Sequence, residues 1–255
     1  MKSKLKTIAL SVMLATGAGV ASAHNVSCDV DMAYDIDLDG QKITLSDNKA
    51  EKVVITGSNE LYLNGDKQSL SSEQRELLGA YAKDIRELLP AATEVAEEAT
   101  SLALEAVRDV TATLLHDNPE KAEKFVSRVD SIAAGIKQHI SDNHLRPNGI
   151  EEYFEGSEFE KEFEELIEDT VVDFVQGNIG EIVAAAMRGD DDKVNTFEKR
   201  MEKFGEEMET KFEAKGELIE KKAEALCQLV EQIDEKEDVF VKAFDKYEKY
   251  QLVTE

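Results

Sequence analysis

Apolar and polar residues alternate in the first part of the chain. From Val26 to Leu38 every even position is apolar, and most odd positions from Asp29 onward are aspartates. A period of two residues is typical of a strand with one buried face. Short apolar runs separated by the turn sequences DG, SDN, TGSN and NGD follow. The pattern predicts a small antiparallel β-meander over residues 24–70.

Apolar residues recur at intervals of three or four after residue 70, which predicts helices. Ser71 and Gln74 match a capping box at the start of the first helix, and Pro90 is expected to end or kink that helix. A second helix is predicted over residues 92–117. A third is predicted to begin at Pro119, with Asn118 as its N-cap.

The remaining third of the chain predicts a loop and two more helices. The loop covers residues 143–157, with Pro147 and two glycines, and a fourth helix follows at roughly 157–188. The three consecutive aspartates 190–192 are expected to cap a long final helix at its positive end. The fold class is therefore α+β and mainly α, with a helical body over residues 71–255 that forms a bundle or hairpin.

The final helix has the spacing of a coiled-coil seam, with a phase shift between Met208 and Ile219. Gly216 and Glu237 interrupt that seam. The interruptions favour an antiparallel hairpin with the fourth helix over one continuous dimeric coil. The first part of the seam consists of Val194, Phe197, Met201, Phe204 and Met208.

The first 23 residues have the composition of a secretory signal peptide. Three lysines precede the apolar run TIALSVMLATGAGVA, and ASA before His24 is typical of a cleavage site after Ala23. No later stretch approaches the roughly 20 apolar residues that a membrane span needs. The sequence predicts an exported mature chain without a membrane span.

The chain is strongly acidic, with 55 acidic and 30 basic residues and a formal net charge of −25. Nucleic-acid binding requires clustered lysine and arginine, so this balance argues against it. An acidic surface favours cationic partners, although a solvated charged surface explains the same composition. The sequence leaves the oligomeric state open.

The two cysteines, Cys28 and Cys227, are expected to pair if the chain is exported to an oxidising compartment. The bond would close a loop of almost the whole mature chain, for which chain-entropy reasoning allows roughly 5 kcal/mol. Two separate buried thiols, or a dimer formed through one of them, are the alternatives.

Asp35, Asp37 and Asp39, followed by Gly40, match the opening of a calcium-binding EF-hand loop. Such a loop needs a bidentate acid at its twelfth position, where this chain has Ser46. A hairpin with Asp39 and Gly40 as a type I′ turn fits better, because it pairs Ile36 with Ile43 and Asp37 with Lys42. We therefore interpret the aspartates as the solvent face of a strand. No cofactor is predicted, and calcium bound by Asp35, Asp37 and Asp39 is kept as an alternative.

No catalytic motif accompanies these features. G-x-S-x-G, H-E-x-x-H, C-x-x-C and glycine-rich phosphate loops are absent from the sequence. His139 and His144 are expected at the surface, and His116 near a helix C-terminus. His24, as a new N-terminus, could chelate copper. Carboxylate pairs such as Glu164 and Glu168 are typical of any solvated helix, so we predict no catalytic residue.

The stretch ITGSNELYLNGDKQSLSSEQRELLGAYAKDIRELLP (55–90), with an early Cys28 and a late helical Cys227, resembles the YggN-like family of uncharacterised gammaproteobacterial periplasmic proteins. The resemblance implies a periplasmic location and supports the pairing of the two cysteines. The family has no established catalytic residues, and the aspartate triplet is not part of its pattern.

These observations favour a non-enzymatic periplasmic binding protein, an adaptor or chaperone-like protein that acts on other periplasmic proteins or cationic clients. One alternative is an acidic protein that binds divalent cations. The other is a hydrolase whose site forms only in the folded chain.

Overall fold

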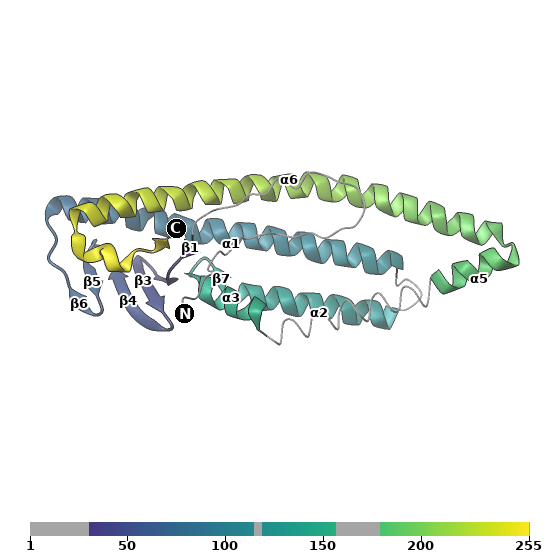
Figure 1. The fold of residues 1–255 in the computed structure, drawn as a ribbon, viewed down its shortest axis with the longest axis horizontal. Coiled ribbons are helices and arrows are strands. Elements are labelled where there is room, and N and C mark those ends of the chain that lie inside the picture. The colour runs from purple at the N-terminus through teal and green to yellow at the C-terminus, as the bar shows by residue number, and fades with distance from the viewer. Residues whose placement is uncertain (1–30, 115–118, 157–178, 255) are drawn as a thin grey trace, which may run out of the picture. The chain divides into compact units, whose positions relative to one another are not determined.

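The computed structural model describes residues 31–114, 119–156 and 179–254. Short strands come first and long helices follow, so the predicted class, α+β and mainly α, is confirmed (Figure 1). The early strands are β1 (Asp31–Met32), β2 (Asp35–Asp39), β3 (Lys42–Asp47), β4 (Ala50–Ile55), β5 (Leu61–Leu63) and β6 (Asp66–Lys67).

Two long helices and several shorter elements make up the rest. The helices are α1 (Ser72–Leu114), α2 (Pro119–Lys137), α3 (Pro147–Glu155), α5 (Gly180–Arg188) and α6 (Asp191–Ala243). The small elements are β7 (Ile140–Ser141), β8 (His144–Leu145), the 3₁₀ helix η2 (Asp245–Tyr250) and β9 (Val253–Thr254). In the described part of the chain, no helix is long and apolar enough to cross a membrane.

The main sheet has seven antiparallel strands in the order β6-β5-β4-β3-β2-β8-β7. The meander supplies five of these strands, and β7 and β8 add a hairpin from beyond α2 beside β2. A separate two-stranded sheet pairs β1 with β9, so residues near both ends of the described chain meet. The β7–β8 hairpin and β9 are strands that the sequence pattern did not predict.

The β2–β3 hairpin differs in register from the predicted one. Ile36 pairs with Leu45 and Asp39 with Lys42, so the two-residue turn is Gly40–Gln41. Gly40 has a φ of +59° whereas Gln41 has no positive φ, which fits a turn with glycine at its first central position and not type I′. The register differs by two residues, and a two-residue shift keeps every side chain on its face.

The chain packs as two compact units, each assembled from separate stretches. The sheet unit contains residues 31–95, 139–151 and 220–254 among those described, which include both sheets and one part each of α1 and α6. The helical unit contains residues 96–114, 119–138, 152–156 and 179–219 of the described chain.

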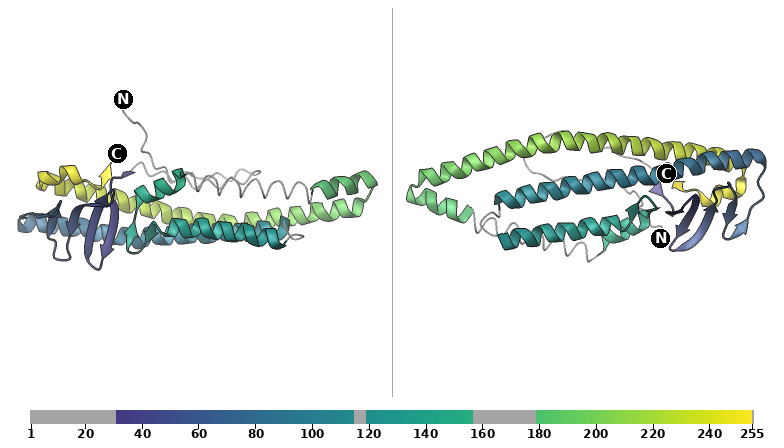
Figure 2. Two further views of the ribbon diagram at one scale, coloured as in Figure 1. Left: turned by 90° about the horizontal axis from the view of Figure 1, so that it is seen from below. Right: turned by 180° about the vertical axis from the view of Figure 1, so that it is seen from behind.

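The sheet unit has a continuous apolar core. Alternate residues of β2, β3, β4 and β5 contact the buried faces of α1 and α6, which lie side by side in this unit (Figure 2). Each large apolar side chain that becomes buried contributes about 1.5–3 kcal/mol. The fully buried members include Ile36, Ile43, Leu45, Ile55, Leu61, Leu78, Ile85, Phe240 and Tyr247.

The helical unit has far fewer buried side chains among its described residues. Leu102, Thr111, Ala133 and Ala185 are buried, whereas no side chain of α6 from Asp191 to Ile219 is. Ion pairs connect its helices instead: Lys211 binds Asp109 and Glu105 at 2.7 Å each. The apolar residues predicted for the seam of α6, from Val194 to Met208, are thus half-buried in this unit.

Helix α1 continues through Pro90, where the sequence predicted a break or kink between two helices. Proline removes one backbone donor and clashes with the preceding turn. Tertiary packing outweighs that cost, because Leu88, Leu89 and Ala92 on either side are buried. The Thr93 hydroxyl also donates to the Leu89 carbonyl at 2.8 Å.

Most of the predicted loop at residues 143–157 is ordered secondary structure, so that prediction was wrong. Pro147 is the first residue of α3, a position that its fixed φ and missing N–H suit. Of the predicted fourth helix, α5 is described, and Lys193 of α6 forms an ion pair with its Glu181 at 2.9 Å. Residues 157–178, and with them the rest of the predicted hairpin with α6, lie outside the described residues. Helix α6 ends at Ala243, and Tyr247 belongs to η2.

Two predicted helix caps are confirmed. Ser71 and Gln74 form the reciprocal bonds of a capping box, at 2.8 and 3.1 Å between side-chain and backbone atoms. Asp190 accepts a hydrogen bond from the Lys193 amide at 3.2 Å and so caps α6.

Candidate functional site

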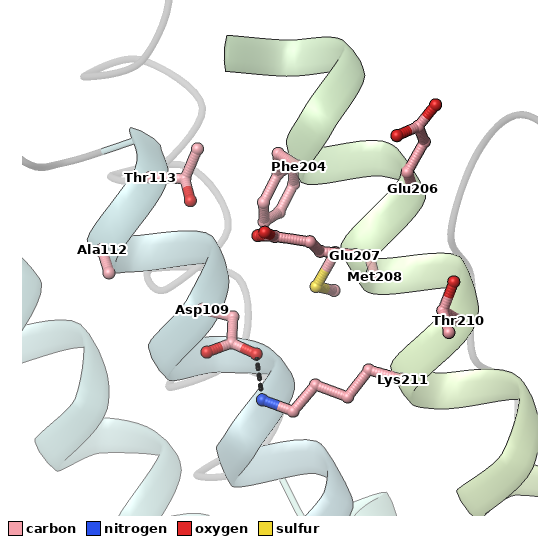
Figure 3. A pocket seen from close by; sticks show the side chains of 9 residues that line it. All are labelled: Asp109, Ala112, Thr113, Phe204, Glu206, Glu207, Met208, Thr210 and Lys211. Atoms are coloured by element: carbon pink, nitrogen blue, oxygen red, sulfur yellow. Dashed lines mark hydrogen bonds and ion pairs between the residues drawn. The ribbon is translucent and has the colours of Figure 1, made fainter.

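A groove of about 620 Å³ lies in the helical unit between the end of α1 and the first half of α6. Figure 3 shows Phe204 and Met208 of α6 directed toward Ala112 and Thr113 of α1. Both belong to the apolar seam that the sequence predicts for α6, so the amphipathic pattern of the helix places them there. The other lining residues are Asp109, Glu206, Glu207, Thr210 and Lys211.

The groove combines an apolar floor with acidic side chains. Asp109, Glu206 and Glu207 contribute three carboxylates, and Lys211 contributes one ammonium group. Lys211 donates to Asp109 within the groove (Figure 3), and hydrogen bonds to Asp109 and Glu105 raise its pKa. Because that lysine is already paired, the lining is net acidic and suits a ligand with apolar and cationic groups.

A second cavity, of about 500 Å³, lies between α1 and α2 of the same unit. Ala112 lines both cavities. The residues around the second are small or polar, apart from Val126. They are Arg108, Thr111, Ala112, Ala122, Glu123, Val126, Ser127 and Asp130.

The sheet unit contains a different feature, the buried carboxyl group of Glu237 on α6. Its side chain is fully buried, and Tyr81 of α1 donates to its Oε1 at 2.5 Å. The Leu252 amide lies 2.8 and 2.9 Å from its two oxygens, and the Val253 amide donates to Oε2 at 3.0 Å. Tyr247 lies beside them, 3.4 Å from Tyr81 between hydroxyl oxygens.

Burial sets the electrostatics of this cluster. It raises the pKa of Glu237 to about 7, against the opposing effect of the three donors. Burial and the neighbouring Glu237 also raise the pKa values of Tyr81 and Tyr247, so both phenols stay neutral. The adjacent Lys236 binds Asp84 of α1 instead of Glu237.

The predicted aspartate strip lies on β2, and protein groups contact two of its members. Arg146 donates to Asp37 at 2.8 Å, and Asn148 donates to Asp35 at 3.5 Å. Burial raises the pKa of Asp35. Across the described residues, no group of three or more His, Cys, Asp or Glu is placed to hold a metal ion.

His139 and His144 are half-buried, not surface residues as predicted. Ser141 and His144 form the closest approach to a catalytic pair, with Oγ and Nδ1 2.8 Å apart. The Ser141 oxygen also accepts the amides of Asn143 and His144, each at 3.2 Å, which is the geometry of a tight turn. Neither cavity described above includes these residues, so the pair closes the β7–β8 turn.

The other predicted sites are His24, His116, Cys28 and Cys227. His24, His116 and Cys28 lie outside the described residues. Cys227 lies half-buried on α6 and is not a free thiol. Its pairing with Cys28 stays a prediction, because that residue is not described.

Sequence reasoning misread Glu237 as a weak point of the α6 seam. The available signal was a glutamate at an apolar seam position, four residues after Ile233 and three before Phe240. A buried carboxylate needs nearby donors, and these come from residues 81, 252 and 253. Residue 81 is remote in sequence, so the pattern could not identify the partners.

The fold and the groove define a mainly helical α+β protein with a sheet unit and an open helical unit. The chain belongs to the DUF2884 family, described as proteins of unknown function, whose sequence profile matches residues 28–253. No curated protein and no solved structure matches the chain. The match confirms the expectation that the chain belongs to an uncharacterised family.

Proposed function

We propose that the chain is a non-enzymatic periplasmic binding protein, with an adaptor or chaperone-like role, whose helical unit holds a cationic amphipathic segment of a partner protein. The observation that carries the proposal is the groove with Phe204 and Met208 on its floor and three carboxylates around it. Apolar grooves between helices bind amphipathic helices through side chains spaced one turn apart.

Charge supports the same class of partner. The net charge of −25 repels acidic partners and attracts basic ones, and three carboxylates line the groove. Methionine in the groove floor suits partners of varied shape, because its side chain is flexible and polarizable.

The proposal includes several sequence-based expectations. Residues 1–23 direct export and are removed after Ala23, Cys28 pairs with Cys227, and the α6 seam packs as a coiled coil. The resemblance to the YggN-like proteins of gammaproteobacteria supports the periplasmic location.

The test measures binding of a fluorescein-labelled amphipathic peptide, with a leucine face and a lysine face, by fluorescence anisotropy. Phe204→Ser in the full chain is expected to weaken binding about tenfold, because one aromatic contact contributes on the order of 1.4 kcal/mol or more. Binding should also weaken with added salt.

Phe154→Ser is the matched control, since Phe154 is an exposed aromatic residue of α3 that does not line the groove. It should bind the peptide as the wild-type chain does. Equal binding by wild type and Phe204→Ser, or an equal loss in both variants, would contradict the proposal. Unchanged circular dichroism in both variants ensures that the comparison reports binding.

A further inference from the structure

Glu237 fastens the last described residues of the chain to the core. After α6 ends, the chain turns back through η2 to β9, and the amides of Leu252 and Val253 bind the Glu237 carboxyl. The Ala33 amide donates to the Leu252 carbonyl at 2.8 Å, and β9 pairs with β1. We call Glu237 and the segment Asp245–Thr254 the C-terminal clasp.

The geometry satisfies hydrogen bonding for both protonation states of Glu237. As a carboxylate, it accepts from Tyr81 and from both backbone amides. As a neutral acid, a proton on Oε1 can be donated to the Tyr81 hydroxyl oxygen, and Oε2 still accepts both amides. The two states therefore differ chiefly in whether a charge is buried.

Among the residues that the structure describes, the groups that face Glu237 do not balance a negative charge. They are Tyr81 from α1, Asp234 from α6, Tyr247 from η2, and Tyr34 next to β2. Lys236 pairs with Asp84, and Asp234 adds a second negative charge that disfavours ionisation of Glu237. A buried charge without a cation is costly, and exposure to water relieves that cost.

We propose that Glu237 is a proton-controlled clasp. While its carboxyl group holds a proton, the segment Asp245–Thr254 stays docked. Loss of that proton to water leaves a buried negative charge and shifts the segment toward an undocked state with a solvated carboxylate. This device acts in the sheet unit and does not depend on the groove.

The direction with pH follows from proton linkage. Burial raises the pKa of Glu237 to about 7 in the docked state, and exposure returns it toward the ordinary value of 4.5. Between these values the docked state binds more protons, so docking weakens as pH rises from about 5 to about 7. Above that range Glu237 is ionised in both states, so the equilibrium between docked and undocked states no longer depends on pH.

Amide hydrogen exchange of the full chain, followed by NMR, tests the clasp. After correction for intrinsic exchange, the opening constant at Leu252 and Val253 should rise about tenfold per pH unit between about pH 5 and 7. Glu237→Gln mimics the neutral acid, since its amide NH₂ can donate to Tyr81 and its oxygen can accept both backbone amides. That variant should show no such rise.

Glu235→Gln is the matched control, because Glu235 is an exposed carboxylate on the same helix. It should keep the wild-type pH dependence. A flat wild-type profile, or an equal slope in Glu237→Gln, would overturn the clasp. An equal rise of the opening constant at the amide of the buried Leu78 would also overturn the clasp, since it would indicate unfolding of the whole unit.

Discussion

The two units use the same two long helices but cover them differently. In the sheet unit, Phe240 of α6 is fully buried under the sheet and the C-terminal segment. In the helical unit, Phe204 of the same helix is half-buried and lines an open groove. One amphipathic pattern therefore forms a closed core under the sheet and an open groove in the helical unit, among the described residues.

Two substitutions, one in each unit, test this difference and include the largest expected effect on stability. Phe240→Ala should lower the free energy of unfolding by about 3–5 kcal/mol, because it leaves a cavity in a closed core. Phe204→Ala should cost clearly less, because water already reaches that side chain. Urea unfolding at equilibrium measures both, and equal losses would remove the distinction between the units.

An intermediate effect concerns pH and belongs to the sheet unit. The pKa of Glu237 is raised to about 7 in the folded chain from an ordinary 4.5, so the folded state binds more protons between these values. The contribution of Glu237 to the free energy of unfolding is fully present below about pH 4.5. It is lost as pH rises through about 7, by roughly 3 kcal/mol.

The measurement compares urea unfolding of the wild type and Glu237→Gln at about pH 5 and pH 8. The wild type should lose more stability than the variant over this interval. A parallel decline in the two proteins would mean that other carboxylates cause the pH dependence.

The smallest effect compares two ion pairs between α1 and α6. Lys236 pairs with Asp84, whose side chain is 3% exposed, whereas Lys211 pairs with Asp109, whose side chain is 37% exposed. Lys236→Met should cost about 2 kcal/mol, because it leaves a buried carboxylate without its partner. Lys211→Met should have little effect on thermal melting. A larger loss of stability in Lys211→Met than in Lys236→Met would contradict the expected order.

Local signals in the sequence predicted local structure well. The capping box at Ser71, the aspartate cap at Asp190 and the change from strand to helix near residue 71 are confirmed. Each depends on residues a few positions apart, which a single sequence contains in full. The prediction failed at Pro90 because tertiary packing keeps α1 continuous there. It failed at residues 143–157 because a short helix, α3, forms where turn residues predicted a loop.

Long-range partners could not be predicted in the same way. The β2–β3 register depended on which residues form the turn, and the β7–β8 hairpin joins β2 from about a hundred residues away. The groove needs α1 and α6 together, although its apolar floor was visible as the α6 seam. Glu237 was visible only as an irregularity, because its donors come from α1 and the C-terminal segment.

The pairing of β1 with β9 has a consequence for folding. Asp31 lies opposite Thr254, so the sheet unit joins residues separated by almost the whole chain. Contacts of such high sequence separation incur loop-closure entropy before they contribute stability, and they slow folding. During synthesis the sheet unit therefore stays incomplete until Val253 and Thr254 have left the ribosome, whereas helical segments such as α2 can begin to form earlier.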